Sequence, residues 1–280
     1  MTKLTDAQRC LLDEWFGDWR IERDHSWPLQ DTVVLHASAG SRSYIVKASR
    51  TSHHIDREIE AHEQLSGRFT GWAPRLVHAS AAQRILVTEY LPGELVEGTD
   101  AEWAQDTYRQ AGARLRDLLI PGTVSKDYLE RVKAKASQSI AAAGELVEPG
   151  QLAQLRDILS AIPARPIALS FTHGDFQPRN WLMNDGQLFV IDFGRADQRH
   201  WTSDLVRLHS QQFVDHEPLK EAFFSGLQRE LTAVDSDVFR IEQVQQAIGT
   251  VVWAHGIHDA EFEDHGRRMI RLILQEQEQQ

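Results

Sequence analysis

The chain has 280 residues, one cysteine and a formal net charge of −11. This length can bury a hydrophobic core without cross-links, and a single cysteine excludes an intramolecular disulfide. The negative charge argues against nucleic acid as a main partner; it suits a cationic ligand, although solubility alone also explains it. No apolar run is long enough to span a bilayer and no apolar leader is recognisable, so we expect a cytoplasmic protein with no membrane partner.

The first ninety residues predict a small lobe that mixes helices and strands. Residues 6–15 place Leu11, Leu12 and Trp15 on one face of a short helix. The β-branched and aromatic runs WRIERDHSW, TVVLHAS and SYIVKAS then predict three antiparallel strands. A helix is expected over HIDREIEAHEQL, and two further strands over PRLVHAS and QRILVTEYL.

From residue 100 onward the pattern is mainly helical. Apolar residues recur at three- and four-residue intervals in AEWAQDTYRQAGARLRDLL, KDYLERVKAKASQSIAAAGEL and QLAQLRDILSAI. Short strands or extended segments are expected only around ALSFTHGD, NWLMN and QLFVIDF, and helices return from residue 202. We therefore predict an α+β fold of two lobes, with a small antiparallel sheet in residues 1–92 and a larger, mainly helical lobe in residues 93–280.

Three polar residues in the interrupting region indicate chemistry. Asp175 and Asn180 lie five apart around Pro178, which suits a loop that turns both side chains to one cleft, and Asp192 ends an apolar strand. One carboxylate that can accept a proton, with an asparagine and a second carboxylate as hard oxygen ligands, is what magnesium-assisted phosphoryl transfer requires. A hydrolase using two carboxylates would leave Asn180 without a role.

A lysine and a glutamate in the first lobe fit the same chemistry. Lys47 lies in the third predicted strand, and Glu58 lies on the flank of the apolar face of the following helix, where it can reach the sheet. Such a pair holds the ammonium group in place to contact nucleotide phosphates.

With these motifs the chain resembles the aminoglycoside phosphotransferase family of small-molecule kinases, which is related in fold to choline kinases and protein kinases. The resemblance covers nearly the whole length and rests on YIVK, REIEAHEQL, ILVTEYLPGE, HGDFQPRN, VIDFGRA and SDLVRL. It implies a two-lobed protein-kinase-like fold, ATP or GTP with Mg²⁺ as cofactors, and a small cationic substrate. The protein is expected to be a monomer or a homodimer.

The resemblance also implies roles for residues of the two central motifs. Asp175 would be the catalytic base, with His173 supporting its loop. Asn180 and Asp192 would be the magnesium ligands. Asp204 would be structural, capping the helix that begins at LVRLHS and bracing the catalytic loop.

For the nucleotide, the resemblance implies that Lys47 contacts the α and β phosphates and that Glu58 positions Lys47. The backbone of Glu89, Tyr90 and Leu91 would form the hinge that hydrogen-bonds the edge of the base.

The sequence departs from the family pattern at two places. Between the first two strands, where a glycine loop is common, the chain has DHSWPLQD, so Ser26 is expected to supply an N–H or a hydroxyl to phosphate. In the catalytic loop, FQPR adds Gln177 and Arg179 near the metal. Arg179 would either help with phosphate charge or bind Asp185 or Asp197.

Acidic residues are the candidates for holding a cationic substrate. A solvated helix face is the ordinary interpretation of such runs, whereas the resemblance implies a cation-binding wall. The main candidates are Asp259, Glu261, Glu263 and Asp264. A second candidate wall follows the hinge, at Glu94, Glu97, Asp100 and Glu102. Arg195, directly after the metal segment, is interpreted as a brace for a nearby carboxylate or as a substrate contact.

The expected function is transfer of a γ-phosphoryl group to a hydroxyl of a small cationic antibiotic, an aminoglycoside or a basic peptide of the capreomycin and viomycin (tuberactinomycin) type. A metabolic kinase acting on an amino alcohol or amino sugar shares the fold and loop and is kept as an alternative. A nucleotide-binding pseudokinase that scaffolds a partner is a second alternative, because the glycine loop is missing. A protein kinase is disfavoured, because no APE-type segment follows the metal motif.

Overall fold

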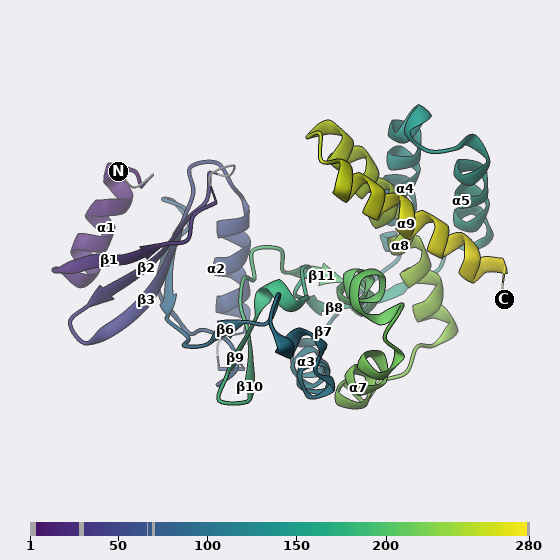
Figure 1. Ribbon diagram of the computed structural model, residues 1–280. Coiled ribbons are helices and arrows are strands. Elements are labelled where there is room, and N and C mark those ends of the chain that lie inside the picture. Colours follow the sequence, from purple (N-terminus) through teal and green to yellow (C-terminus); the bar gives the residue numbers. More distant parts are fainter. Residues whose placement is uncertain (1–3, 28–30, 66, 69–70, 279–280) are drawn as a thin grey trace. The chain divides into compact units, whose positions relative to one another are not determined.

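The computed structural model describes residues 4–27, 31–65, 67–68 and 71–278 (Figure 1). The chain forms two compact units. The first unit comprises Met1–Leu118, His173–Asp197 and Glu221–Gln228, and the second comprises Leu119–Thr172, Gln198–Lys220 and Arg229–Gln280. Each unit is made of several separate stretches of the chain. The boundary predicted between residues 92 and 93 divides the chain into two lobes at a single point, and it remains a prediction.

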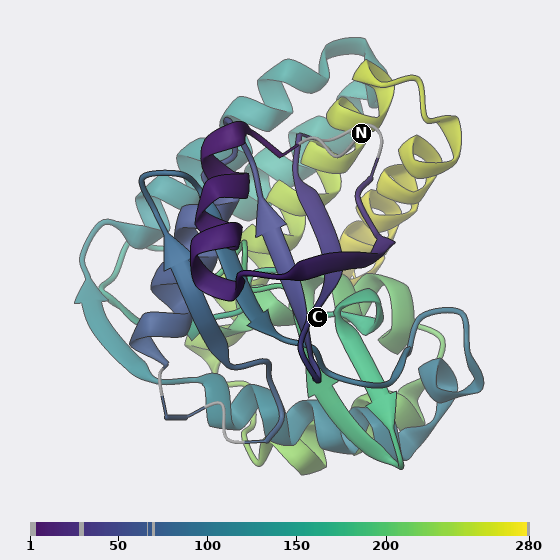
Figure 2. The same cartoon turned by 90° about the vertical axis from the view of Figure 1, so that its left-hand side faces the viewer.

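The first unit is built on a five-stranded antiparallel sheet, with strand order β1-β2-β3-β5-β4. Its strands are β1 (Trp19–Asp24), β2 (Val33–Ala39), β3 (Arg42–Ala48), β4 (Leu76–Ser80) and β5 (Ile85–Glu89). Helices α1 (Asp6–Phe16) and α2 (His54–Gln64) cover its two faces (Figure 1), and Figure 2 looks onto the face that α1 covers. The predicted strands and helices of this region are confirmed.

Side chains that alternate between the two faces of the strands allow the sheet to pack against a helix on each face. Val46 and Val87 are buried in one cluster with Leu12 of α1, whereas Leu86 is buried with Ile55 of α2. Since successive side chains of a strand point to opposite faces, Lys47, next to Val46, lies on the α2 side of the sheet. The sheet thus turns its central lysine toward the helix that carries Glu58.

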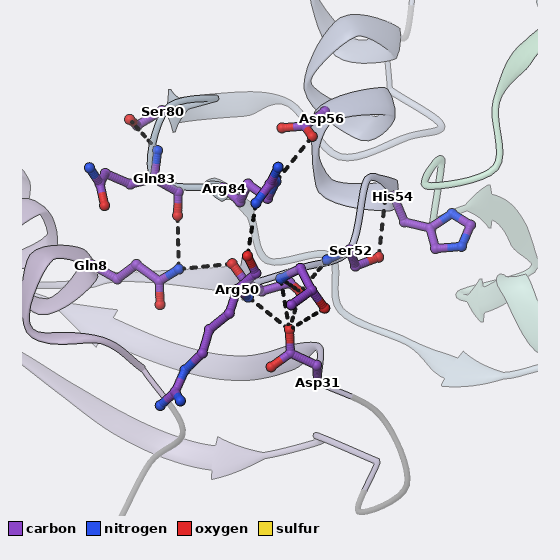
Figure 3. Close-up of polar contacts among 11 residues, drawn as sticks. Gln8, Asp31, Arg50, Ser52, His54, Asp56, Ser80, Gln83 and Arg84 are labelled. Atoms are coloured by element: carbon purple, nitrogen blue, oxygen red, sulfur yellow. Dashed lines mark hydrogen bonds and ion pairs between the residues drawn. The ribbon is translucent and has the colours of Figure 1, made fainter.

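Asp31 fixes the loop between β3 and α2 (Figure 3). Its Oδ2 accepts hydrogen bonds from the hydroxyls of Ser49 (2.7 Å) and Thr51 (3.0 Å) and from the N–H groups of Arg50 (2.8 Å) and Thr51 (3.0 Å). The Ser49 hydroxyl and these backbone donors lower the pKa of Asp31 to about 2. Gln8 of α1 adds bonds from Nε2 to the Ser49 carbonyl (3.1 Å) and the Gln83 carbonyl (2.8 Å).

The rest of the first unit carries the chain away from the sheet and back to it. It contains β6 (Glu94–Leu95), the 3-10 helix η1 (Asp100–Trp103), α3 (Gln105–Leu118), the 3-10 helix η3 (Pro178–Asn180), β9 (Trp181–Asn184) and β10 (Gln187–Val190). Strands β10, β9 and β6 form a small antiparallel sheet. The sequence analysis did not predict β6, because Pro92 and Gly93 interrupt any strand pattern there.

The second unit is mainly helical, as predicted. Its elements are β7 (Pro121–Ser125), α4 (Tyr128–Ala143), η2 (Gly144–Leu146), α5 (Pro149–Ala161), β8 (Ile167–Thr172), η4 (Trp201–Leu205), α6 (Val206–Leu208), the π-helical turn η5 (His209–Phe213), α8 (Ala233–Gly256) and α9 (Ala260–Glu278). Strand β11 (Asp197–Arg199) and helix α7 (Glu217–Leu227) cross the boundaries between the units. Helices α4, α8 and α9 pack together (Figure 1) over a common core that includes Ile140, Val244 and Ile270. No helix of the described residues combines the length and the apolar character needed to cross a bilayer.

A buried carboxyl group lies inside this second unit. Glu242 of α8 accepts a hydrogen bond on Oε1 from the Tyr128 hydroxyl (2.6 Å), and its Oε2 lies 3.4 Å from Thr202 Oγ1. Burial raises the pKa of Glu242 to about 8, with the nearby carboxylate of Asp204 acting in the same direction and Arg199 opposing it. Glu242 is therefore protonated in the folded protein at neutral pH.

This protonation makes stability depend on pH. Since the unfolded carboxyl has a pKa of about 4.3, the folded state binds the extra proton between about pH 4.3 and 8, and stability falls as pH rises through that window, by up to about 1.4 kcal/mol per pH unit. His200 has its pKa lowered to about 4 by burial and acts with the opposite sign, but only below about pH 6.5.

We predict that Glu242→Gln flattens the decline of the melting temperature between pH 6.5 and 8, because glutamine keeps the shape and hydrogen bonds without titrating. Thermal unfolding in buffers across this range measures the slope. Glu145→Gln, an exposed position, is the control and should keep the wild-type slope. Parallel slopes for wild type and Glu242→Gln would contradict the protonation of Glu242.

Candidate active site

An ion cluster joins three segments of the first unit. Lys47 Nζ of β3 donates to both carboxylate oxygens of Glu58 (2.8 and 3.0 Å) and to Oδ1 of Asp192 (3.0 Å). Burial opposes the charged ammonium, yet Asp192 and Glu58 together raise the pKa of Lys47 above its usual value. The positive charge of Lys47 lowers the pKa of Asp192 to about 2. The side chain of Glu58 is 4% exposed and that of Asp192 50%, so the cluster reaches from the interior to the surface.

Asp192 is held in a sparsely populated backbone conformation. Its φ is 67°, in the left-handed region that few residues other than glycine adopt. The turn that follows packs against α2, where Nδ1 of His54 lies 2.7 Å from the carbonyl oxygen of Gly194. A Cβ on Gly194 would lie 3.3 Å from the Cβ of His54, so there is little room for a side chain at this position. Strain of this kind is common where a side chain is presented for function.

Hydrogen bonds tie the loop over residues 173–180 to the segment before Asp192. His173 Nδ1 accepts the N–H of Asp175 (3.3 Å), and its Nε2 donates to the carbonyl of Ile191 (3.0 Å), the pattern of a neutral imidazole. Asn180 Nδ2 donates to the carbonyl of Asp175 (2.8 Å), and the Ile191 N–H donates to the carbonyl of Asn180 (2.9 Å). These contacts place Asn180 beside the segment that carries Asp192, with its Oδ1 available as a cation ligand.

The carboxylate of Asp175 is fixed by its own loop. Gln177 Nε2 donates to Oδ1, and Arg179 Nη2 donates to Oδ2 at 2.7 Å. Asp175 is buried, with 5% of its side chain exposed, while that of Arg179 is 46% exposed. From the sequence, Arg179 was expected to help with phosphate charge or to bind Asp185 or Asp197. In the structure its carboxylate partner is Asp175. Asp197 instead has its Oδ2 3.9 Å from Nη2 of Arg57.

A pocket of about 600 Å³ opens beside these residues within the first unit. The residues that line it include the apolar Val34, Ile45, Pro74, Leu182 and Ile191, the polar Thr88, Glu89 and Glu94, and the charged Lys47, Glu58, Asp192, Arg179 and Arg23. A pocket lined by both apolar and cationic side chains can hold a flat base joined to a phosphate chain.

The predicted hinge also lines this pocket, and its hydrogen bonds distinguish its three residues. The N–H of Glu89 donates to the Arg75 carbonyl (2.9 Å), and the N–H of Tyr90 donates to the Ser43 carbonyl (3.1 Å). The Leu91 N–H has no such bond among the residues that the structure describes. Leu91 is therefore the hinge residue whose amide can donate to a ligand.

Ser26 is not among the residues that line the pocket. Its N–H donates to Oδ1 of Asp24 (2.8 Å), and its hydroxyl accepts the N–H of Val34 (3.0 Å), so both groups serve the loop itself. Arg23 and His25 line the pocket from the same segment, and the sequence analysis missed them. A bulge in β1 shifts the register between Ile21 and Arg23, so alternation along the sequence does not reveal which side chains face the pocket. Residues 28–30 of this segment lie outside the described residues.

The acidic residues near the C-terminus belong to the second unit, and two have local partners. Asp259 Oδ1 accepts the N–H of Phe262 (3.0 Å) at the start of α9. The carboxylate of Glu263 pairs with Arg267 (2.5 Å) and His255 (3.1 Å). Glu261 and Asp264 are exposed.

The acidic residues after the hinge lie in the first unit. Glu94 lines the pocket, and Glu102 Oε2 accepts the N–H of Gly98 (2.7 Å). Glu97 and Asp100 are exposed. Of the two candidate walls, only this one is in the same unit as the pocket.

Five further predicted positions lie outside the pocket lining: His173, Asp175, Asn180, Arg195 and Asp204. Arg195 is exposed in the turn after Asp192. Asp204 is buried in the second unit, but the prediction that it caps a helix is wrong, because η4 runs through Asp204 and the residue before α6 is Leu205, with no side-chain cap. The 3-10 helix continues directly into α6, so no helix start is left for Asp204 to cap.

A metal ion would find only part of its ligands here. No cluster of three or more His, Cys, Asp or Glu side chains within the described ranges could hold a metal. Asn180 and Asp192 are two oxygen donors on adjacent segments, and Mg²⁺ is commonly bound by one or two such groups together with phosphates and water. The donor set therefore fits a magnesium ion that arrives with a nucleotide.

The sheet with its lysine–glutamate pair, the hinge and the polar loop together define a protein-kinase-like fold, as the sequence predicted. The model of the APH family, described as the phosphotransferase enzyme family, matches residues 26–236. The chain belongs to this family of phosphotransferases. No curated protein sequence gave a significant match.

Solved structures of the same fold cover nearly the whole chain. The gentamicin complex of APH(2")-IIa is 18% identical over 96% of this chain and 97% of that chain, with a TM-score of 0.65. The macrolide 2'-phosphotransferase MphH from Brachybacterium faecium is 16% identical over 95% and 97%, with a TM-score of 0.66. The GDP and kanamycin complex of APH(2")-IIia is 14% identical over 97% and 99%, with a TM-score of 0.70. At these identities the likeness shows the fold alone.

We predict that Lys47→Met lowers the free energy of unfolding by about 3 kcal/mol, because it leaves the buried Glu58 carboxylate without its cation. Urea unfolding at pH 7 measures this loss. The double variant Lys47→Met/Glu58→Gln should recover most of it, since no buried charge remains. Equal losses in the single and double variants would contradict this cause, because removing the Glu58 charge would then recover nothing.

Proposed function

We propose that this phosphotransferase is a magnesium-dependent kinase that transfers the γ-phosphoryl group of ATP or GTP to a hydroxyl of a small cationic antibiotic. The observation that carries the proposal is the Lys47–Glu58–Asp192 cluster, which lines the same pocket as the hinge. That arrangement serves a nucleotide, whose base and phosphates need opposite environments.

The nucleotide would enter the pocket with its base against the apolar side chains. Val34 and Ile45 belong to the five-stranded sheet. Leu182 belongs to β9 of the small sheet, and Ile191 directly precedes Asp192. The Leu91 N–H would donate to the edge of the base. Lys47 would contact phosphate oxygens, and Arg23, Lys47 and Arg179 supply positive charge where glycine amides are missing.

Asp175 would act on the acceptor hydroxyl. Its hydrogen bonds to Gln177 and Arg179 fix the plane of the carboxylate, which would orient the hydroxyl and accept its proton. The hydrogen bonds of His173 to the backbone of Asp175 and of Ile191 support a structural role for it. Asn180 and Asp192 would hold Mg²⁺, which when bound neutralises phosphate charge and aligns the phosphate chain.

The cationic substrate is proposed from charge. The net charge is −11, and Glu94 lines the pocket, with Glu97 and Asp100 nearby in sequence and exposed. Asp259, Glu261, Glu263 and Asp264 remain the second proposed wall, with Glu261 and Asp264 as its exposed members. Aminoglycosides and tuberactinomycin-type peptides carry several ammonium groups, and the similar structures are named for gentamicin, kanamycin and macrolides.

The function is tested by nucleoside diphosphate release with ATP and GTP, with and without Mg²⁺, across aminoglycosides, macrolides, tuberactinomycin-type peptides and amino alcohols. We expect turnover that requires Mg²⁺ and an aminoglycoside or a tuberactinomycin-type peptide. Turnover confined to amino alcohols would instead establish a metabolic kinase. Nucleotide binding without turnover on any acceptor would establish a pseudokinase.

We predict that Asp175→Asn lowers kcat by about 10²- to 10⁴-fold, the usual contribution of a general base, while nucleotide affinity changes less than threefold. Steady-state kinetics and calorimetric titration of the nucleotide measure the two effects. Asp185→Asn, a change of the same chemistry on an exposed turn, is the control and should leave both quantities unchanged. Wild-type turnover in Asp175→Asn would remove Asp175 as the base.

A further inference from the structure

Arg179 contacts the proposed catalytic base and also lines the proposed nucleotide pocket. Its guanidinium binds the buried Asp175 carboxylate at 2.7 Å, and its side chain also lines the nucleotide pocket. Gln177 binds the other oxygen of the same carboxylate but does not line the pocket. The two neighbours of Asp175 are therefore not equivalent.

The guanidinium has donors to spare. Its hydrogen bond to Asp175 uses Nη2, and an arginine presents five N–H donors in a planar fork that matches phosphate oxygens. With 46% of its side chain exposed, Arg179 is also accessible to a ligand, whereas Asp175 beneath it is buried. Arg179 therefore contacts the carboxylate that would receive the proton of the acceptor, and it also lines the pocket that would hold the phosphate chain.

We propose that Arg179 is a ligand of the γ-phosphoryl group, bridging it to Asp175; this rests on the proposed kinase function. The hydroxyl of the acceptor gives its proton to Asp175 while its oxygen forms a bond to the γ-phosphorus. The bond from that phosphorus to the bridging oxygen breaks, and its electron pair leaves on the nucleoside diphosphate. Through this step the remaining N–H groups of Arg179 bind the non-bridging oxygens, whose charge they stabilise.

A binding measurement isolates this contact without any acceptor. Dissociation constants of the full-length protein are measured with Mg²⁺ for ADP and for a non-hydrolysable β,γ-imido ATP analogue, with the matching guanine nucleotides in parallel. Arg179→Met should weaken triphosphate binding by about 10- to 100-fold, the range for a hydrogen bond to a charged group, and diphosphate binding by less than threefold. Arg179→Lys should restore part of the triphosphate affinity.

Two controls separate this contact from other effects of the substitution. Gln177→Met removes the other partner of Asp175 and should leave the ratio of triphosphate to diphosphate affinity unchanged. Arg109→Met removes the same charge from the surface of α3, where Arg109 pairs with Asp106, and should also leave the ratio unchanged. Circular dichroism and thermal unfolding confirm that each variant is folded.

A double variant excludes an indirect effect through Asp175. If Arg179 only neutralises the Asp175 charge, then Arg179→Met will not change the affinity ratio in an Asp175→Asn background. If Arg179 binds the γ-phosphoryl group, the loss of triphosphate affinity persists in that background. Persistence supports the proposal, and disappearance overturns it.

The remaining outcomes distinguish this proposal from the proposed function. A wild type that binds both nucleotides, with Arg179→Met lowering both affinities equally or neither, overturns the role of Arg179 and leaves the kinase function standing. A wild type that binds neither nucleotide overturns the kinase function and the role of Arg179 with it.

Discussion

The two ion pairs made by the ammonium group of Lys47 are the interactions on which the first unit depends. This group holds a strand, a helix and a turn together, because Glu58 and Asp192 both bind it and neither belongs to the strand that carries it. Removing this cation would leave a buried carboxylate in an apolar interior, a cost that the remaining contacts of α2 would have to bear. The same group lines the pocket, so one set of contacts stabilises the fold and positions a side chain of the site.

The catalytic loop is organised by a different means. Its geometry comes from hydrogen bonds between neighbours in sequence, with His173, Gln177, Arg179 and Asn180 all bonded to Asp175. These local hydrogen bonds fix the conformation of the loop. The hydrogen bond from His173 to the carbonyl of Ile191 fixes the position of the loop relative to Asp192.

Much of this could be predicted from the sequence. Helical and alternating patterns identified α1, α2 and the five strands, because each buries one face against a neighbour. The motif order identified Lys47, Glu58, Asp175, Asn180 and Asp192 as candidates, and the structure brings Lys47, Glu58 and Asp192 into contact. What could not be predicted depends on contacts that spacing does not encode: a bulge turns Arg23 to the pocket, the hydroxyl of Ser26 is used by Val34, and the guanidinium of Arg179 binds the residue four positions earlier. Only the capping role predicted for Asp204 is wrong, because a 3-10 helix continues through it into α6.

Asp31 is not among the residues that line the pocket, yet its carboxylate holds the loop between the strand of Lys47 and the helix of Glu58. The distance between those two side chains is thus set partly by a residue that no substrate touches. Selection acting on the enzyme would constrain Asp31 as it constrains the pocket. A random-mutagenesis screen for inactive but folded variants should therefore recover substitutions at Asp31. Such variants would lose activity although the substituted residue does not line the pocket.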